Sequence, residues 1–315
     1  MNKFYTLFGR MLPVVSLSAL ALAGCHKAPV ETVRVATYNI RCPAKDGENN
    51  WDKRRADLVT LVKKMDLDVF GLQEVAPEQA AYLRAQLPEF AFVGEHREAD
   101  RVSGEASPVC YRKSRFDALK AGTFWLSETP DVPGRKGWGA ACPRVCSYLI
   151  LRDKPSGRTF CFANTHTDHI SALAREKGMT LVIERMKDFG AGAPIVFVGD
   201  HNCRETEAPA LAVAKLLKNA LHESETPPAG SWRTWNDWRW RDSEVPTASA
   251  LRLSAEVRNQ LDGSFYEECG GPRIDYIYVS PGVRVLDYVT VNDSRPGLKR
   301  YPSDHFPIVA TLALP

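Results

Sequence analysis

Six short polar clusters border apolar segments that are predicted to be β-strands, and together these clusters could do chemistry. They supply four carboxylates, two imidazoles and two amides: Glu74, Asp200, Asp275, Asp304, His166, His305, Asn39 and Asn202. A carboxylate beside a buried strand is costly unless it is paired, hydrogen-bonded or bound to a metal. A single Asp or His at a strand end is usually a cap or a turn residue, but turn chemistry does not explain six such ends.

This set of side chains suits a hard cation. Carboxylates and amides without the paired Cys and His spacing of a zinc site favour Mg²⁺ or Mn²⁺, with water and substrate phosphate as the remaining ligands. Imidazoles beside the ion can stabilise the negative charge of a phosphoryl transition state, and a spare Asp can activate water. The residues therefore predict metal-assisted hydrolysis of a phosphoester.

The elements that must position these side chains alternate between strands and helices. Hydrophobic periodicity predicts strands over residues 32–40, 69–72, 90–94, 108–112, 147–151, 159–164, 194–199, 274–280, 283–291 and 308–312. It predicts helices over residues 52–65, 77–87, 172–189 and 209–221. We expect a long surface segment over 113–145 and an irregular insertion rich in Trp over 225–270. This order predicts one α/β domain, from residue 32 to 315, with packed sheets and outer helices.

Residues 1–24 are predicted to be a bacterial lipoprotein signal peptide. A basic start precedes an apolar stretch that is too short to span a bilayer. The stretch ends in Leu22-Ala23-Gly24-Cys25, which resembles the signal after which the Cys becomes the lipidated N-terminus. We therefore expect residues 25–31 to be a linker and Cys25 to anchor the protein at the cell envelope, on the outer membrane or the periplasmic side, without crossing the membrane. A plain secretory signal and a buried N-terminal helix are the alternatives.

The composition excludes several classes of protein. With 44% hydrophobic and 25% charged residues, the sequence fits a folded globular protein and not a collagen-like, low-complexity or wholly disordered one. Loss of Lys3 and Arg10 with the leader lowers the formal net charge from +3 to +1. A protein so close to neutrality has no bulk basic bias for long nucleic acid, which leaves only a local basic groove for such a partner.

The polar clusters also resemble the motif series of the endonuclease/exonuclease/phosphatase superfamily, which has the fold of deoxyribonuclease I, exonuclease III and sphingomyelinase. The matching segments run in order from about residue 32 to 314: Asn39, Leu72-Gln73-Glu74, Asn164-Thr165-His166, Gly199-Asp200-x-Asn202, Arg273-Ile274-Asp275-Tyr276 and Ser303-Asp304-His305. Each motif alone is weak, whereas six in order are specific. The segment Asn50-Trp51-Asp52-x-Arg54-Arg55 is most similar to bacterial secreted members near the deadenylase and nocturnin branch.

The resemblance implies a four-layer αββα sandwich, in which two central mixed sheets are flanked by helices. It implies that Glu74, Asn39 and Asp304 bind the metal, Mg²⁺ or Mn²⁺. It also implies that Asp200 orients or deprotonates the attacking water and that Asn202 holds a phosphate oxygen.

The same resemblance implies roles for the imidazoles. His305 is expected to contact the scissile phosphate and to be oriented by Asp275. His166 is expected to stabilise the phosphate from the other side, with Asp168 and His169 extending toward the leaving group. One position departs from the family pattern, because His201 stands where Phe is usual. We expect His201 to be a structural residue with a partner, or else an additional phosphate contact or second-metal ligand.

Two further features are candidates for contact with the substrate. Arg144 could grip a terminal phosphate with two hydrogen bonds, or could be a plain surface residue. Four Trp residues alternate with arginines in one stretch: Trp232, Trp235, Trp238 and Trp240. Aromatic rings beside arginines can stack on a base or a sugar, with Trp235 as a candidate, but a loop folded over the sheet would use them for packing.

Three function classes fit these observations. The first is a phosphatase or phosphodiesterase for a small phosphorylated molecule at the cell envelope. The second is a nuclease, for example a 3′–5′ RNA exonuclease that takes short nucleic acid. The third is a lipoprotein that only binds, which the complete acidic and imidazole set disfavours. We expect a monomer, with no protein partner evident from the sequence.

Overall fold

Two mixed β-sheets face each other across a shared apolar core. The computed structural model describes Met1 and residues 31–244, 246–251 and 272–315. In the described residues, the first sheet has the strand order β10-β12-β13-β1-β2-β4-β3, and the second has the order β5-β6-β7-β8-β11-β9. Cys25 and the predicted leader lie outside the described residues.

The bounds of the elements mostly match the predicted ones. The strands are β1 (Thr32–Asn39), β2 (Val69–Gln73), β3 (Phe90–Val93), β4 (Val109–Arg112), β5 (Phe116–Trp125), β6 (Val145–Asp153), β7 (Thr159–His166), β8 (Ile195–Asp200), β9 (Lys218–Asn219), β10 (Ala229–Gly230), β11 (Asp275–Val279), β12 (Arg284–Thr290) and β13 (Ile308–Ala313). The helices are α1 (Trp51–Lys64), α2 (Pro77–Gln86), α3 (Ala172–Gly190), α4 (Ala208–Ala214), α5 (Ala220–Glu223) and α6 (Thr247–Leu251), with a 3₁₀ turn at Gly47–Asn49. None of the helices in these ranges combines the length and the apolar character that a membrane span requires.

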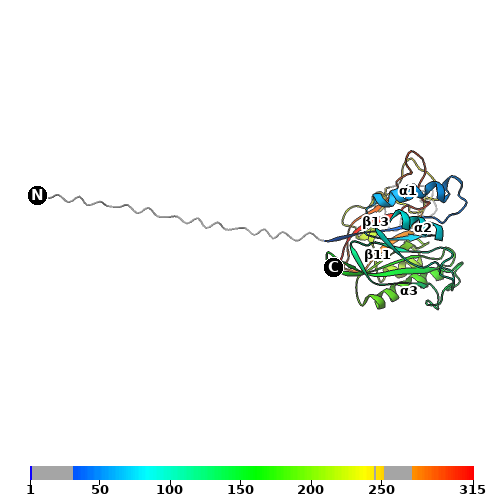
Figure 1. Cartoon of the computed structure of the whole chain (residues 1–315), viewed down its shortest axis with the longest axis horizontal. Coiled ribbons are helices and arrows are strands. Elements are labelled where there is room, and N and C mark those ends of the chain that lie inside the picture. Colours follow the sequence, from blue (N-terminus) through cyan, green and yellow to red (C-terminus); the bar gives the residue numbers. More distant parts are fainter. Residues whose placement is uncertain (2–30, 245, 252–271) are drawn as a thin grey trace. The chain divides into compact units, whose positions relative to one another are not determined.

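Helices cover the outer face of each sheet, which confirms the predicted four-layer sandwich. Side chains of α1 and α2 share one apolar cluster with β1, β2 and β4, and those of α3 and α4 share another with β6, β7 and β8. Figure 1 shows α1 and α2 on the side of β13, and α3 on the side of β11.

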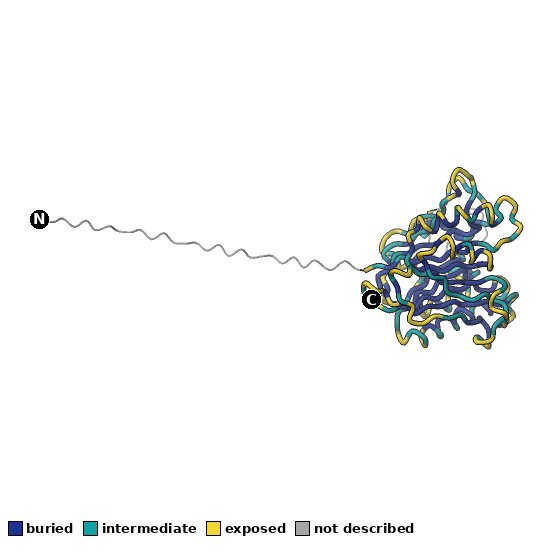
Figure 2. Tube along the Cα trace, in the orientation of Figure 1, coloured by how far each residue is buried: buried dark blue, intermediate teal, exposed yellow. Residues whose placement is uncertain are grey.

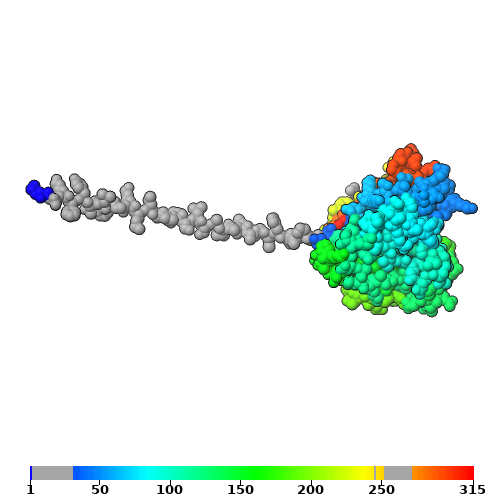
Figure 3. All heavy atoms as spheres, viewed as in Figure 1, coloured from blue at the N-terminus to red at the C-terminus, as the bar shows by residue number. Residues whose placement is uncertain are grey.

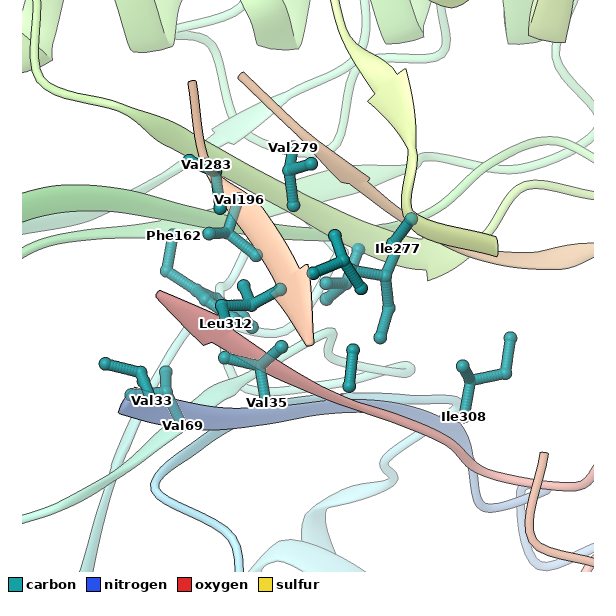
Figure 4. Packing of buried hydrophobic residues seen from close by; sticks show 14 of the residues in the cluster. Val33, Val35, Val69, Phe162, Val196, Ile277, Val279, Val283, Ile308 and Leu312 are labelled. Atoms are coloured by element: carbon teal, nitrogen blue, oxygen red, sulfur yellow. The ribbon is translucent and has the colours of Figure 1, made fainter. Parts of the chain in front are cut away.

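The core between the sheets is built from alternating side chains of the central strands. Val33 and Val35 of β1 and Leu312 of β13 point toward Phe162 of β7 and Val196 of β8 (Figure 4). Successive side chains of a strand point to opposite faces, so the same strands also feed the outer clusters. The buried trace in Figure 2 follows these central strands, because both of their faces are covered.

Two predictions of secondary structure were wrong. The segment 113–145, expected to be surface, contains β5 over Phe116–Trp125. This strand pairs with β6 alone and is largely exposed in its middle, so it lacks the apolar run of a central strand. The helix expected over 209–221 ends at Ala214, because β9 pairs with β11 and a separate short helix follows.

The strand directions bring the polar clusters to one edge of the sandwich. The parallel strands β1 and β2 end with Asn39 beside Gln73, and the parallel strands β7 and β8 end with His166 beside Asp200. β11 runs antiparallel to β8, so its first residue, Asp275, lies opposite Asp200. β13 runs antiparallel to β1, so the segment that precedes it returns to the same edge.

Buried amides join the two sheets below this edge. Gln73 Nε2 of β2 donates to Asn164 Oδ1 of β7 at 2.6 Å, and Asn164 Nδ2 donates to the carbonyl oxygens of Leu72 (2.8 Å) and Pro108 (2.9 Å). The approach requires glycine at position 71, where a Cβ would lie 2.4 Å from Asn164 Cγ. The sheets are therefore held in fixed register where the polar clusters meet.

The loops around the edge are tied down by arginines. Arg54 of α1 donates to the carbonyl oxygens of Ile40, Arg41 and Pro302, although its side chain is fully buried. Arg295 pairs with Asp57 of α1 at 2.7 Å. In Figure 3 the orange-red segment that precedes β13 lies beside the blue loop ahead of α1, where Arg295 makes these contacts.

Candidate active site

The strand ends form one cleft with a volume of about 650 Å³. Nine of the predicted site residues line it: Glu74, Arg144, His166, His169, Asp200, Asn202, Trp235, Asp304 and His305. Asn39 and Asp275 are buried and touch these residues through hydrogen bonds. The structure thus brings together side chains that are spread over the whole domain in the sequence.

Asp200 sits at the centre of the cleft. Its Oδ1 accepts the backbone N–H of Asn202 at 3.0 Å, and its Oδ2 accepts Asn39 Nδ2 at 2.9 Å. Burial and the nearby charge of Asp275 raise the pKa of Asp200 to about 7. A carboxylate with this pKa is suited to take a proton from water near neutral pH, because it is ionised there and still basic.

His305 and Asp275 form a buried pair beside Asp200. His305 Nδ1 donates to Asp275 Oδ2 at 2.9 Å, and His305 Nε2 lies 3.7 Å from Asp200 Oδ2. Burial opposes a charge on His305, but the carboxylates of Asp275 and Asp200 outweigh it and raise the pKa of the imidazole to about 10. His305 is therefore a cation, and its Nε2 faces the cleft 3.5 Å from Asn39 Nδ2.

His166 differs from His305 in charge. Its Nε2 accepts a hydrogen bond from Asn202 Nδ2 at 2.9 Å. Burial and the neighbouring charge of Arg144 lower the pKa of His166 well below its usual value. His166 is therefore neutral in the free protein, and an anion bound beside it would favour its protonated form.

Glu74 and Asp304 form the acidic end of the cleft. Glu74 Oε2 accepts the backbone N–H of Cys42 at 2.9 Å, and Glu74 Oε1 accepts Asn39 Nδ2 at 3.0 Å. Burial disfavours the ionised form of Glu74, but the hydrogen bonds from Cys42 and Asn39 and the positive charge of His305 outweigh it and lower its pKa. Burial raises the pKa of Asp304. Asp304 is buried and the Glu74 side chain is 12% exposed, and two such carboxylates fit a hard divalent cation.

Asn39 was predicted to be a metal ligand, and the structure places it differently. Its Oδ1 accepts the backbone N–H of Arg41 at 3.0 Å, so its amide nitrogen faces Glu74 and Asp200. An amide N–H cannot bind a cation. Asn39 therefore positions the two carboxylates.

A second acidic group also has the donors that a metal needs. Ligand atoms of Asp200, Asp275 and His305 lie within 4.8 Å of one another. However, His305 Nδ1 is bonded to Asp275 Oδ2 at 2.9 Å, so two of these three side chains are already paired with each other. Glu74 and Asp304 are therefore the better candidates in the part of the chain that the structure describes.

Guanidinium groups line the cleft on the His166 side. Arg144 is buried, and its Nη2 lies 3.0 Å from His169 Nδ1. Arg97 donates to Glu105 at 2.7 Å. Among the described residues, neither Arg97 Nε nor Arg144 Nε has a hydrogen-bond partner. Both nitrogens are buried and face carboxylates, Arg97 Nε toward Glu98 and Arg144 Nε toward Asp168, each at 3.7 Å. The two guanidinium groups therefore add positive charge to this wall of the cleft.

Sequence reasoning missed Arg41, Arg97 and Glu105 as residues of the cleft. Arg41 follows directly after the Asn39 motif, which was a usable signal. Arg97 and Glu105 lie in the polar loop between β3 and β4, and backbone hydrogen bonds within this loop carry them to the cleft. No spacing in the sequence predicts that contact.

Asp168 was predicted to face the substrate, but it does not line the cleft. Its carboxylate is buried and accepts the backbone N–H groups of Ala141, Ile170 and Ser171. These contacts place the start of α3 next to the segment that carries Arg144. Asp168 therefore has a structural role.

Three of the four Trp residues between positions 232 and 240 pack against the protein, and residues 245 and 252–270 of the predicted insertion lie outside the described residues. Trp232 lies 5.1 Å from the guanidinium carbon of Arg273, Trp238 covers Arg54 at 5.5 Å, and Trp240 stacks on Tyr301 at 5.1 Å. Trp235 alone among the four lines the cleft, where it pairs with His305 through a β-bridge. The packing alternative thus holds for the other three.

His201 points away from the cleft. Its ring is stacked with Phe197, Tyr276 and Tyr278 in the apolar cluster beneath α3 and α4. Within the described residues neither ring nitrogen has a side-chain hydrogen-bond partner, and burial lowers its pKa to about 3. His201 is a neutral packing residue, as the structural alternative predicted, and its partners are aromatic rings.

Sequence comparison identifies the protein's relatives. The profile of the Endonuclease/Exonuclease/phosphatase family matches residues 36–305. The chain belongs to this family. Members of the family are hydrolases that act on phosphoester bonds, and they generally use divalent metals. The family assignment and the two-sheet fold confirm the resemblance on which the site was predicted.

Three relatives show the range of this family. A mannosyl-6-phosphatase of Bacteroides thetaiotaomicron is 32% identical, with a TM-score of 0.75 over 89% of this chain and 99% of that one. Tyrosyl-DNA phosphodiesterase 2 of Bos taurus is 23% identical over 270 residues, which are 84% of this chain and 64% of that protein. Nocturnin of Drosophila melanogaster is 24% identical over 297 residues, 87% of this chain and 44% of that protein. The chain thus spans less than two thirds of the length of these two curated relatives.

Replacement of Asp275 should lower the pKa of His305. In Asp275→Asn the strongest neighbouring anion is gone, so we expect the imidazole to titrate well below the value of about 10 that it has beside Asp275. NMR titration of the ring protons measures this shift. Asp287→Asn, which changes a half-exposed carboxylate of β12, should leave it in place.

The raised pKa of His305 also determines how the His305–Asp275 pair affects the stability of the fold at different pH values. His305 has a pKa raised from 6.5 to about 10 in the folded protein, so the pair stabilises the fold fully below pH 6.5. This contribution is lost as the pH rises through 10. Equal His305 titration in the parent and in Asp275→Asn would contradict the pairing.

Proposed function

We propose that this protein is a divalent-metal-dependent phosphoesterase that hydrolyses phosphomonoesters of small molecules. One observation carries the proposal. A single cleft holds a carboxylate with a pKa of about 7, Asp200, among the imidazoles of His166 and His305 and the amide of Asn202. A base, an anion-binding imidazolium and hydrogen-bond donors at one point are what hydrolysis of a phosphoester requires.

Glu74 and Asp304 are the residues that would hold the metal, Mg²⁺ or Mn²⁺. They fit because both are nearly buried carboxylates on one cleft wall and because the family generally uses divalent metals. When bound, the cation supplies Lewis-acid stabilisation of the negative charge on the phosphoryl group.

The chain's own residues divide the remaining work. Asp200 takes the proton from the attacking water, while Asn39 holds its carboxylate in place. His305 donates from Nε2 to a phosphate oxygen, and Asp275 keeps its ring oriented and charged. Asn202 positions His166, because its Nδ2 donates to His166 Nε2 at 2.9 Å and to the Thr167 carbonyl oxygen at 3.1 Å. The Asn202 backbone is left-handed, with φ of 46°, which fixes where this amide points.

The charge of the cleft favours a monoester over a diester. A terminal phosphate carries two negative charges near neutral pH, whereas a diester carries one. Arg97 and Arg144 place two guanidinium groups beside His166 on the wall of the cleft. A guanidinium binds two oxygens of one phosphate, so a dianion gains more from this wall.

A phosphosugar is the first substrate class to test. The similar mannosyl-6-phosphatase supports it, and Trp235 offers a ring surface beside His305 on which a sugar could stack. A nuclease would need a longer track of aromatic and basic groups, and three of the four Trp residues of the Trp-rich segment are committed to packing. Hydrolysis of short RNA in preference to phosphosugars would favour the exonuclease alternative.

We further propose that the enzyme works at the bacterial cell envelope and is anchored by lipid on Cys25. The support is the sequence of the leader, whose apolar core ends in Ala23-Gly24-Cys25. A lipid anchor would hold the domain at the membrane surface without a membrane span.

Substitution of the proposed base tests the mechanism. Asp200→Asn should lower turnover of phosphomonoesters by roughly 10²–10⁴-fold, because the water loses its proton acceptor. Binding of Mn²⁺, measured by calorimetry, should persist, since Glu74 and Asp304 are unchanged. Asp287→Asn is the matched control and should keep both properties. Near-normal turnover in Asp200→Asn, or activity that survives a chelator, would reject the mechanism.

Loss of Arg144 should change the preference for phosphate charge. In Arg144→Ala we expect kcat/KM for p-nitrophenyl phosphate to fall about 10- to 100-fold, as for a lost charge-assisted hydrogen bond, and that for the bis(p-nitrophenyl) diester to fall much less. Arg152→Ala removes an exposed arginine of β6 and should affect neither. A parallel fall for both substrates would argue against a site for dianions.

Replacement of Cys25 tests the anchor. Cys25→Ser should abolish labelling by radioactive palmitate and move the protein from the membrane fraction to the soluble fraction of a bacterial host. Cys142→Ser should keep the label and the membrane association. Palmitate labelling of the Cys25→Ser variant would contradict anchoring at this residue.

A further inference from the structure

Arg41 is held in an unusual position at the acidic end of the cleft. Its backbone N–H donates to Asn39 Oδ1, and its carbonyl oxygen accepts Arg54 (2.6 Å) and Gln79 (2.8 Å). The backbone is left-handed, with φ of 58°, which non-glycine residues seldom adopt. These bonds fix the main chain, so only the side chain of Arg41 can move.

The guanidinium of Arg41 faces the two carboxylates that would bind the metal. Arg41 Nε lies 3.7 Å from Asp304 Oδ2, and Arg41 Nη1 lies 3.8 Å from Glu74 Oε2. Both separations exceed hydrogen-bond length, so the contacts are electrostatic and do not lock the side chain. The Arg41 side chain donates one hydrogen bond among the described residues, from Nε to Asp46 Oδ2 at 3.2 Å.

The charge on Arg41 is secure, and its head group is partly exposed. Burial opposes the charge, but Asp46, Asp304 and Glu74 outweigh it and raise its pKa further above the usual range. The side chain is 32% exposed and lines the cleft. The Arg41 guanidinium is already partly buried, so it can turn toward a ligand in the cleft and lose only part of its hydration.

A metal cation bound to Glu74 and Asp304 would lie next to the positive charge of Arg41. The guanidinium of Arg41 is a permanent positive charge within 4 Å of both acids. It repels a divalent ion and competes with it for the same carboxylate oxygens. An anion in the cleft would draw the guanidinium away from the acids, since guanidinium binds phosphate oxygens well. The two ligands should then assist each other's binding.

We propose that Arg41 couples metal binding to phosphate binding. Its guanidinium weakens the hold of Glu74 and Asp304 on the metal in the free protein, and it becomes a phosphate ligand when a phosphate enters the cleft. The metal is then bound firmly only together with the phosphate group. This inference rests on the proposed metal site, and it adds a coupling residue that the proposed reaction does not itself require.

The test measures Mn²⁺ binding by calorimetry, independently of activity. Arg41→Gln should bind Mn²⁺ three- to tenfold more tightly than the parent protein, because the competing charge is gone. Arg41→Lys keeps a charge and should stay closer to the parent. Lys45→Ala removes an exposed charge from the same loop, outside the cleft, and should bind Mn²⁺ as the parent does.

Inorganic phosphate supplies the second arm of the test. Phosphate should increase the Mn²⁺ affinity of the parent several-fold, and by thermodynamic reciprocity Mn²⁺ should increase the affinity for phosphate equally. In Arg41→Gln this mutual effect should shrink toward none. Unfolding midpoints in urea confirm that each variant is folded.

The outcomes separate this inference from the function on which it rests. Mn²⁺ binding that is unchanged or weaker in Arg41→Gln, or coupling to phosphate that persists there, would overturn the role of Arg41. Mn²⁺ binding that is absent in the parent protein even with phosphate present, or that is unaffected in Glu74→Gln, would instead overturn the metal site itself.

Discussion

The amide of Asn39 joins two carboxylates that belong to different sheets. Its Nδ2 lies 3.0 Å from Glu74 Oε1 and 2.9 Å from Asp200 Oδ2. Glu74 follows a strand of the first sheet and Asp200 ends a strand of the second. Like charges at this spacing repel, and a shared donor offsets part of that repulsion. The cleft can therefore keep a metal-binding carboxylate and a basic carboxylate side by side only while the two sheets stay in register, which the Gln73–Asn164 bridge below them enforces.

Strained backbone conformations at the strand ends also help to position the side chains of the cleft. Glu74, Asn202 and Arg41 adopt φ of 60°, 46° and 58°, each directly or almost directly after a strand of the cleft. A left-handed residue there turns the chain out of the sheet at once, so the side chain is delivered at the sheet edge instead of over the core. Such conformations cost about 1–3 kcal/mol each. The buried hydrogen bonds of Arg54 and Gln79 to the Arg41 carbonyl hold one of these turns in place.

The sequence was a good guide wherever a pattern is local or belongs to the central strands. β1, β2, β7, β8 and β11 are apolar and β-branched, so their ends, and the polar residues there, could be placed in advance. The edge strand β5 has one neighbour and an exposed middle, which removes that pattern. The sequence also could not predict roles that depend on the direction in which a side chain points. Asp168 turned out to bond three backbone N–H groups, and Asn39 presents its nitrogen because Arg41 N–H occupies its oxygen.

The two imidazoles show how burial alone does not decide charge. His166 and His305 are similarly buried at neighbouring strand ends, yet their pKa values move in opposite directions. His305 faces Asp275 and Asp200, whereas Arg144 stands beside His166 and adds to the effect of burial. The cleft therefore keeps one permanent cation, His305, next to the proposed base. It also holds a neutral ring, His166, whose protonated form is favoured when an anion binds beside it. Because His166 is neutral until an anion binds, the free cleft carries less positive charge to repel a metal from the acidic end.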